Sequence, residues 1–105
     1  MSTTSRAVFL SYGRSLAITY DELGRHTDAE TMLGKLKTRM GEADAYQYAE
    51  IYAQWGNRER ALECLETAWC LRDAGLGYLK ADFLLDPLRK EPRFHAVEQA
   101  LKFPE

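Results

Sequence analysis

Apolar side chains recur at helical spacing along most of the chain. The sets Leu16, Tyr20, Leu23 and Tyr48, Tyr52, Trp55 both show the spacing i, i+4, i+7. Such spacing places side chains on one face of an α-helix, and no segment shows the period-two alternation of a half-buried strand. The pattern predicts an all-α chain, with helices at about 5–23, 27–40, 44–55, 58–72 and 92–102.

Helix ends are predicted from residues with special backbone or capping properties. Gly24 and Gly56 each follow the last residue of one of these apolar sets, and glycine adopts the left-handed conformation of a helix C-terminus at low cost. N-terminal caps are predicted from Thr27 with Glu30, from Asp44 with Gln47 and from Asn57.

The sequence contains two similar segments, and equivalent residues in them are separated by a constant offset. This offset equals the separation between Gly24 and Gly56. The other equivalent pairs are Ala17 with Ala49, Tyr20 with Tyr52, Ala29 with Ala61 and Leu33 with Leu65. Small residues allow two helix axes to approach closely, while the larger ones fill the space around them. Each unit is therefore expected to be a helix, a turn and a second helix.

These positions resemble the tetratricopeptide repeat, whose unit is slightly longer than the offset seen here. The second unit carries all six signature positions, namely Ala49, Tyr52, Gly56, Ala61, Leu65 and Ala68, and the first carries five. Two positions differ from the family pattern. Gly13 stands in the first unit where the family usually has a large apolar residue, and Asp73 stands in the second unit where the family has its closing proline. The resemblance implies a single domain over residues 1–105: a tetratricopeptide-like α-solenoid of two antiparallel helix pairs, about 10–41 and 42–73, and a capping segment, about 74–105.

The capping segment is similar to the closing segment of bacterial tetratricopeptide proteins. The matching residues are Leu85, Asp86, Pro87, Leu88, Arg89, Pro92, Arg93 and Phe94. We expect Phe94, Val97 and Leu101 to cover the last apolar face, and Arg89 and Arg93 to pair with Asp82, Asp86 or Glu91. In proteins of this kind the repeats often follow a winged-helix or cyclase domain, so the alternative function is a regulatory arm that acts in cis.

The resemblance implies a non-catalytic module that binds a protein or peptide partner in a concave groove. The groove residues that it implies are Arg14, Ile18, Asp21, Tyr46, Glu50, Ala53 and Gln54. Ile18 and Tyr46 are expected to supply the apolar contact. A homodimer through Phe9 and Tyr12 of the N-terminal helix is also open.

Composition and charge narrow the function classes. The net charge of -2 comes from 14 basic and 16 acidic residues scattered along 105 positions, which does not indicate a nucleic-acid partner. No apolar run approaches the roughly 20 residues that cross a bilayer, so we expect no membrane partner and a cytoplasmic location.

A small enzyme is the rival class, but the sequence contains none of the motifs that would support it. There is no glycine-rich phosphate loop, no nucleophile elbow and no zinc-binding histidine pair. His26 and His95 stand apart, while Cys64 and Cys70 are expected to fill the core. We therefore expect no catalytic residue, no cofactor and no metal.

Overall fold

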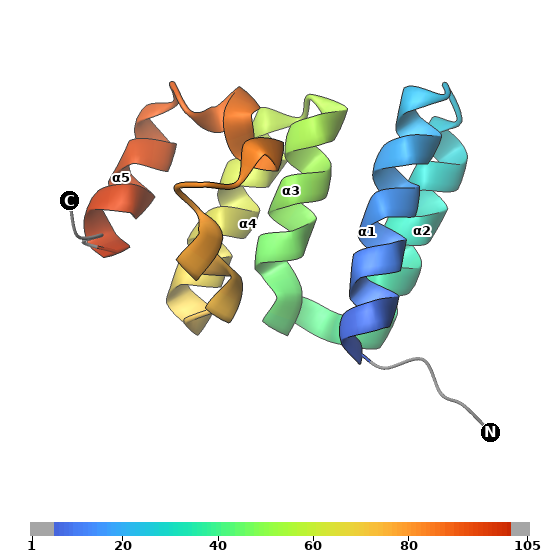
Figure 1. Ribbon diagram of the computed structural model, residues 1–105, viewed down its shortest axis with the longest axis horizontal. Helices are drawn as coiled ribbons and strands as arrows, with labels where there is room; N and C mark the ends of the chain where they lie inside the picture. The colour runs from blue at the N-terminus through green and yellow to red at the C-terminus, as the bar shows by residue number, and fades with distance from the viewer. Residues whose placement is uncertain (1–5, 102–105) are drawn as a thin grey trace. The chain divides into compact units, whose positions relative to one another are not determined.

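The computed structural model describes the backbone of residues 6–101 and the side chains of residues 13–101 except 42, 43 and 74. Within this range the chain is all-α and contains no strand (Figure 1). The α-helices are α1 (Arg6–Glu22), α2 (His26–Met40), α3 (Ala45–Trp55), α4 (Arg58–Leu71) and α5 (Pro92–Leu101). The 3-10 helices are η1 (Gly41–Asp44), η2 (Ala74–Tyr78) and η3 (Phe83–Leu88).

The α-helices lie close to their predicted bounds, and the predicted end at Lys102 falls outside the described residues. None of the described helices is long and apolar enough to span a membrane.

The chain divides into two compact units, Met1–Gly41 and Glu42–Glu105. In the first unit α1 and α2 form an antiparallel hairpin (Figure 1). In the second unit α3 and α4 form another hairpin, η2 and η3 pack on α3, and α5 packs on α4. The boundary between the units coincides with the boundary between the two sequence repeats.

Both hairpin turns have the same backbone hydrogen bonds, at positions related by the offset of the sequence repeat. The pairs are Gly24 N–Asp21 O (3.0 Å), Arg25 N–Tyr20 O (2.8 Å), Gly56 N–Ala53 O (3.1 Å) and Asn57 N–Tyr52 O (2.9 Å). Gly24 and Gly56 have φ values of 80° and 85°, in the left-handed region that glycine tolerates best. The two glycines therefore end their helices as the sequence predicts.

Small residues at the hairpin interfaces are fully buried. Ala17 and Ala29 in the first unit, like Ala49 and Ala61 in the second, have no exposed surface. Gly13 extends this close packing, because a Cβ atom at that position would lie 2.7 Å from the Leu36 side chain. The close approach of α1 and α2 therefore explains why glycine replaces a large apolar residue.

The predicted N-terminal cap is confirmed at Asn57, is confirmed only in its position at Asp44 and is wrong at Thr27. Asn57 Oδ1 accepts the Arg60 backbone N–H at 3.2 Å. In the first hairpin the equivalent position is Arg25, so α2 begins at His26 and Thr27 lies inside it. Asp44 is at the N-cap of α3, but its side chain makes no capping hydrogen bond. The turn geometry, which is the same in both hairpins, decides the starting residue and overrides the local Thr-x-x-Glu pattern.

Candidate partner-binding surface

Three of the seven predicted groove residues lie on α1. Arg14, Ile18 and Asp21 are each partly exposed. Their i, i+4, i+7 spacing places them on one face of the helix. The structure therefore brings these three residues together on the surface of the first hairpin.

The other four predicted groove residues lie on α3, where three of them are inaccessible. Tyr46, Glu50 and Ala53 are 1%, 3% and 1% exposed, and Gln54 is half-buried. Within the second unit, η2 and η3 pack against α3. The prediction of a groove is therefore corrected for Tyr46, Glu50 and Ala53, because a partner peptide cannot reach side chains that are already buried.

Tyr46 is held by hydrogen bonds at both its backbone and its side chain. Its backbone N–H donates to Asp73 Oδ2 at 3.1 Å, and its hydroxyl donates to Asp82 Oδ2 at 2.6 Å. Burial, followed by the hydrogen bond to the Asp82 carboxylate, strongly raises the pKa of the phenol. The hydroxyl therefore stays protonated and acts as a structural donor.

Asp73 and Asp82 play the same part at the starts of η2 and η3. Asp73 Oδ1 accepts the Gly75 N–H at 2.9 Å, and Asp82 Oδ1 accepts the Leu84 N–H at 3.0 Å. In each aspartate the other carboxylate oxygen binds Tyr46. Each side chain thus caps a short helix and also attaches it to α3.

Gln54 adds a further attachment at the other end of α3. Its side-chain amide donates to the Leu84 carbonyl oxygen at 2.9 Å. The apolar residues of the segment are buried as well, since Leu79, Leu85 and Leu88 have no exposed surface. The C-terminal segment therefore covers α3 with both polar and apolar contacts.

Sequence reasoning missed the roles of Asp73 and Asp82. The available signal was local, because an aspartate two residues before a turn amide commonly caps that turn. Their bonds to Tyr46 join positions 27 and 36 residues apart, and no local pattern predicts such pairs.

Two arginines fix the last turns of the chain. Arg89 donates to Asp86 Oδ1 at 2.9 Å and to the Asp82 carbonyl at 2.8 Å, so its predicted pairing is confirmed. Arg93 pairs with two residues of α4 rather than with the predicted acids: it donates to both carboxylate oxygens of Glu66, at 2.9 and 2.7 Å, and to Glu59 at 2.9 Å. This bidentate pair attaches α5 to α4.

His26 stands between two carboxylates at the turn of the first hairpin. Its Nδ1 lies 2.6 Å from Asp21 Oδ1, and its Nε2 lies 3.0 Å from Glu30 Oε2. Both nitrogens donate only when the ring is protonated, so the hydrogen bond to Asp21, followed by the charge of Glu30, raises the pKa of His26 above its ordinary value. Asp21 is therefore part of the turn as well as of the exposed α1 face.

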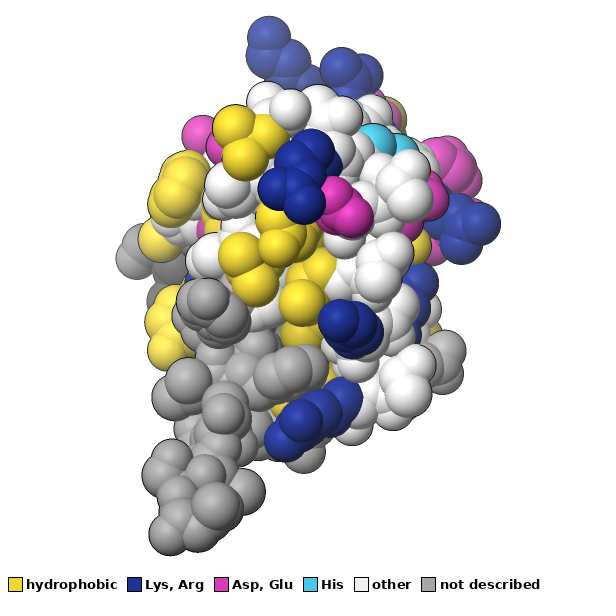
Figure 2. All heavy atoms as spheres, turned by 90° about the vertical axis from the view of Figure 1, so that its right-hand side faces the viewer, with side chains coloured by type: hydrophobic (Ala, Val, Ile, Leu, Met, Phe, Trp, Pro, Cys, Tyr) yellow, Lys and Arg dark blue, Asp and Glu magenta, His cyan; other side chains and the backbone are white. Residues whose placement is uncertain are grey.

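Apolar surface also gathers on the first hairpin. Figure 2 shows a band of hydrophobic side chains on the side of the molecule where α1 and α2 lie, with Lys and Arg side chains next to it. Partly exposed apolar residues of this hairpin are Leu16, Ile18, Tyr20 and Met32. Phe9 and Tyr12, which the sequence suggests for self-association, have side chains outside the described set.

The residues with potential chemistry are dispersed within the described part of the chain. Cys64 is half-buried and Cys70 is exposed, so the expectation of a core position is wrong for Cys70. His95 Nε2 lies 2.6 Å from the Arg89 carbonyl oxygen. Among the described residues, no group of three or more His, Cys, Asp or Glu side chains could hold a metal ion.

Comparison of the chain with family models, with curated proteins and with solved structures gave no match.

Proposed function

We propose that this protein is a non-catalytic, tetratricopeptide-like interaction module that binds a protein or peptide partner on its first hairpin. The observation that carries the proposal is the duplicated hairpin, whose two turns and buried alanines correspond at the offset of the sequence repeat. When a helical hairpin is repeated, the same face of each copy presents side chains at equivalent positions. Repeat proteins bind other chains on such faces.

The second hairpin provides an internal example of how such a face is occupied. There Tyr46 donates to a carboxylate and Gln54 donates to a backbone carbonyl, both on the segment that covers α3. At the repeat offset, Arg14 of α1 corresponds to Tyr46. Arg14 is also a hydrogen-bond donor, so a partner that places an acidic side chain near it would make a contact of the same kind.

Ile18 supplies the apolar part of this surface. It is partly exposed and lies one helical turn from Arg14. At the repeat offset it corresponds to Glu50 of α3, which is 3% exposed. On the second hairpin, η2 and η3 cover α3. A partner that covers Ile18 would cover α1 of the first hairpin in a similar way.

The experiment compares two neighbouring glutamate substitutions in the tagged full-length chain. Ile18→Glu changes the proposed face, and Thr19→Glu adds the same charge at an exposed position on the next face of the helix. A partner is captured from lysate with the wild type, identified by mass spectrometry and purified, and its affinity for each chain is measured by titration calorimetry. We expect at least a tenfold weaker affinity for Ile18→Glu and an unchanged affinity for Thr19→Glu, because only the first substitution buries an unpaired carboxylate against the partner.

Equal affinities of the wild type and both variants for the purified partner would refute the proposed surface. Circular dichroism melting of the three chains accompanies the titration, so that loss of binding is separated from loss of the fold. If the captured protein is a second copy of this chain, the same variants are compared by sedimentation equilibrium.

A further inference from the structure

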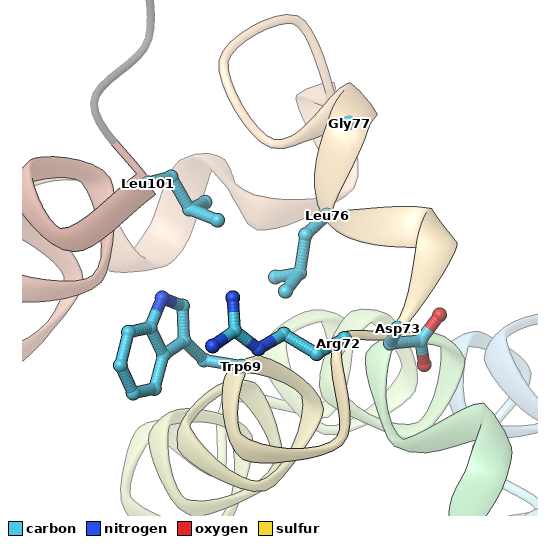
Figure 3. A pocket seen from close by; sticks show the side chains of 6 residues that line it. All are labelled: Trp69, Arg72, Asp73, Leu76, Gly77 and Leu101. Atoms are coloured by element: carbon cyan, nitrogen blue, oxygen red, sulfur yellow. The ribbon is translucent and has the colours of Figure 1, made fainter.

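A cleft opens in the second unit between the end of α4, η2 and the end of α5. Its volume is about 270 Å³, and it is lined by Trp69, Arg72, Asp73, Leu76, Gly77 and Leu101 (Figure 3). Figure 3 shows the Leu76 and Leu101 side chains reaching toward the cleft opposite Trp69 and Arg72. All six residues belong to the second unit, whereas the proposed α1 surface belongs to the first.

Arg72 occupies a backbone conformation that usually belongs to glycine. It is the C-cap of α4 with φ 59° and ψ 44°, and it is the one non-glycine residue with positive φ in the described part of the chain. A residue with a side chain is disfavoured in this region, because its Cβ atom crowds the backbone. Arg72 therefore carries a long side chain at a position that favours glycine.

The guanidinium of Arg72 lies 5.7 Å from the centre of the Trp69 ring. Figure 3 shows the guanidinium and the nitrogen-bearing edge of the indole side by side, facing the cleft. Within the described part of the chain, the Arg72 side chain has no carboxylate partner and Trp69 Nε1 has no acceptor. The cleft thus presents two hydrogen-bond donors, the indole N–H and the guanidinium that also contacts the Trp69 ring.

Asp73 does not neutralise these donors. Its carboxylate points away from the guanidinium (Figure 3) and accepts the backbone N–H groups of Gly75 and Tyr46 at 2.9 and 3.1 Å. The remaining walls are mainly the apolar side chains of Leu76 and Leu101. The cleft therefore combines a cation and a neutral hydrogen-bond donor with apolar walls. These features match a ligand that has a carboxylate group attached to an apolar hydrocarbon part.

We propose that this cleft binds a small apolar monocarboxylate. Arg72 and the indole N–H of Trp69 hold the carboxylate, while the ligand body lies against Leu76 and Leu101. The volume is slightly below the usual range for drug-sized ligands, so the ligand is about the size of a phenyl ring with a short chain.

The probe is 4-phenylbutyrate, and 4-phenylbutanol is its neutral control. The two tryptophan indole N–H signals of the full chain are followed by two-dimensional NMR, and Trp55→Phe assigns the Trp69 signal. We expect a saturable downfield shift of the Trp69 signal with 4-phenylbutyrate and about tenfold weaker binding of the alcohol, because the charged hydrogen bond is absent.

Substitution of Arg72 decides between a built site and a nonspecific apolar contact. Arg72→Gly removes the cation and suits the left-handed backbone, so this variant is expected to stay folded while losing the tenfold preference for the acid. Arg72→Gln removes the charge without adding glycine, and Arg60→Gln removes an exposed charge elsewhere on α4. We expect the preference to be lost in Arg72→Gln and kept in Arg60→Gln. Equal affinity for acid and alcohol in the wild type, or a preference that survives in both Arg72 variants, overturns the proposal.

Discussion

Individual glycines contribute to this fold in opposite ways. Gly56 ends α3 in the left-handed region, at φ 85°, where it closes the turn between α3 and α4. Gly34 lies inside α2, and a Cβ atom there would meet nothing within 4 Å. The first glycine is required by its backbone, whereas the second only adds conformational entropy to the unfolded chain.

The two glycines therefore respond oppositely to alanine. Gly56→Ala is expected to lower the free energy of unfolding by about 1–2 kcal/mol, the cost of left-handed backbone with a side chain. Gly34→Ala is expected to raise it by about 0.5–1 kcal/mol through helix propensity. Urea denaturation of both variants measures the difference, and a change of the same sign in both would contradict the assigned backbone conformations.

Tyr46 attaches the C-terminal segment to α3 through two hydrogen bonds. Tyr46→Phe removes the donor to Asp82 and leaves a partly buried carboxylate oxygen without it. We expect a loss of about 1–3 kcal/mol in the free energy of unfolding. The matched control is Tyr78→Phe, where the side chain is 72% exposed and a change within about 0.5 kcal/mol is expected. Similar losses in both variants would show that the hydroxyl bond to Asp82 contributes nothing specific.

At the scale of elements, the first hairpin turn contains a pH-dependent contact. His26 bonds Asp21 and Glu30, and these contacts raise its folded-state pKa above the ordinary value of about 6.5. A raised pKa means that the stabilisation is fully present below about pH 6.5 and is lost as the pH rises through the folded-state value. The turn is thus best held in mildly acidic solution.

NMR titration of the His26 ring protons tests this contact. In Asp21→Asn the pKa should fall toward the ordinary value, because the largest contribution to the shift is removed. Glu66→Gln, a substitution in the other unit, should leave the pKa of His26 unchanged. A His26 pKa that is identical in wild type and Asp21→Asn would rule out the contact.

The junction of α4 and α5 depends on pH in the opposite sense. The hydrogen bonds from Arg93 lower the pKa of Glu66, so the pair stabilises the protein above the ordinary glutamate pKa, and this stabilisation is lost as the pH falls through the folded-state value. We expect Arg93→Gln to raise the pKa of Glu66 and to lower the melting temperature more at pH 7 than at pH 3. Arg93→Lys keeps the charge but cannot form the bidentate hydrogen bond, so the pKa of Glu66 should lie between those in the wild type and in Arg93→Gln. An equal drop in melting temperature at both pH values would point to lost packing rather than to the ion pair.

The elements themselves were largely predictable, whereas the contacts between distant segments were not. Helical spacing around Tyr20 and Tyr52, with glycine at each turn, predicted the hairpins because helices and turns are determined by nearby residues. The burial of Tyr46 and the pairing of Arg93 with Glu66 depend on segments that are remote in sequence. Sequence reasoning therefore named accessible side chains on α1 but mistook most of its α3 residues for surface positions.

At the scale of the whole molecule, the two repeats have different surroundings. The chain continues past α4 and returns over α3, so that the second hairpin is covered within its own unit. The first unit ends at Gly41, directly after α2, and has no comparable segment among its described residues. This asymmetry is the reason that the proposed partner is assigned to the first hairpin.

The most direct test of this account is amide hydrogen exchange of the full chain, followed residue by residue. The amides of Leu79, Leu85 and Arg89 donate to backbone carbonyls of the covering segment. If that segment is part of the folded unit, they should exchange at rates within about tenfold of the Asn57 amide at the α3–α4 turn. Exchange of all three at the rate of an unfolded peptide, while Asn57 stays protected, would show that α3 is uncovered and would contradict the account.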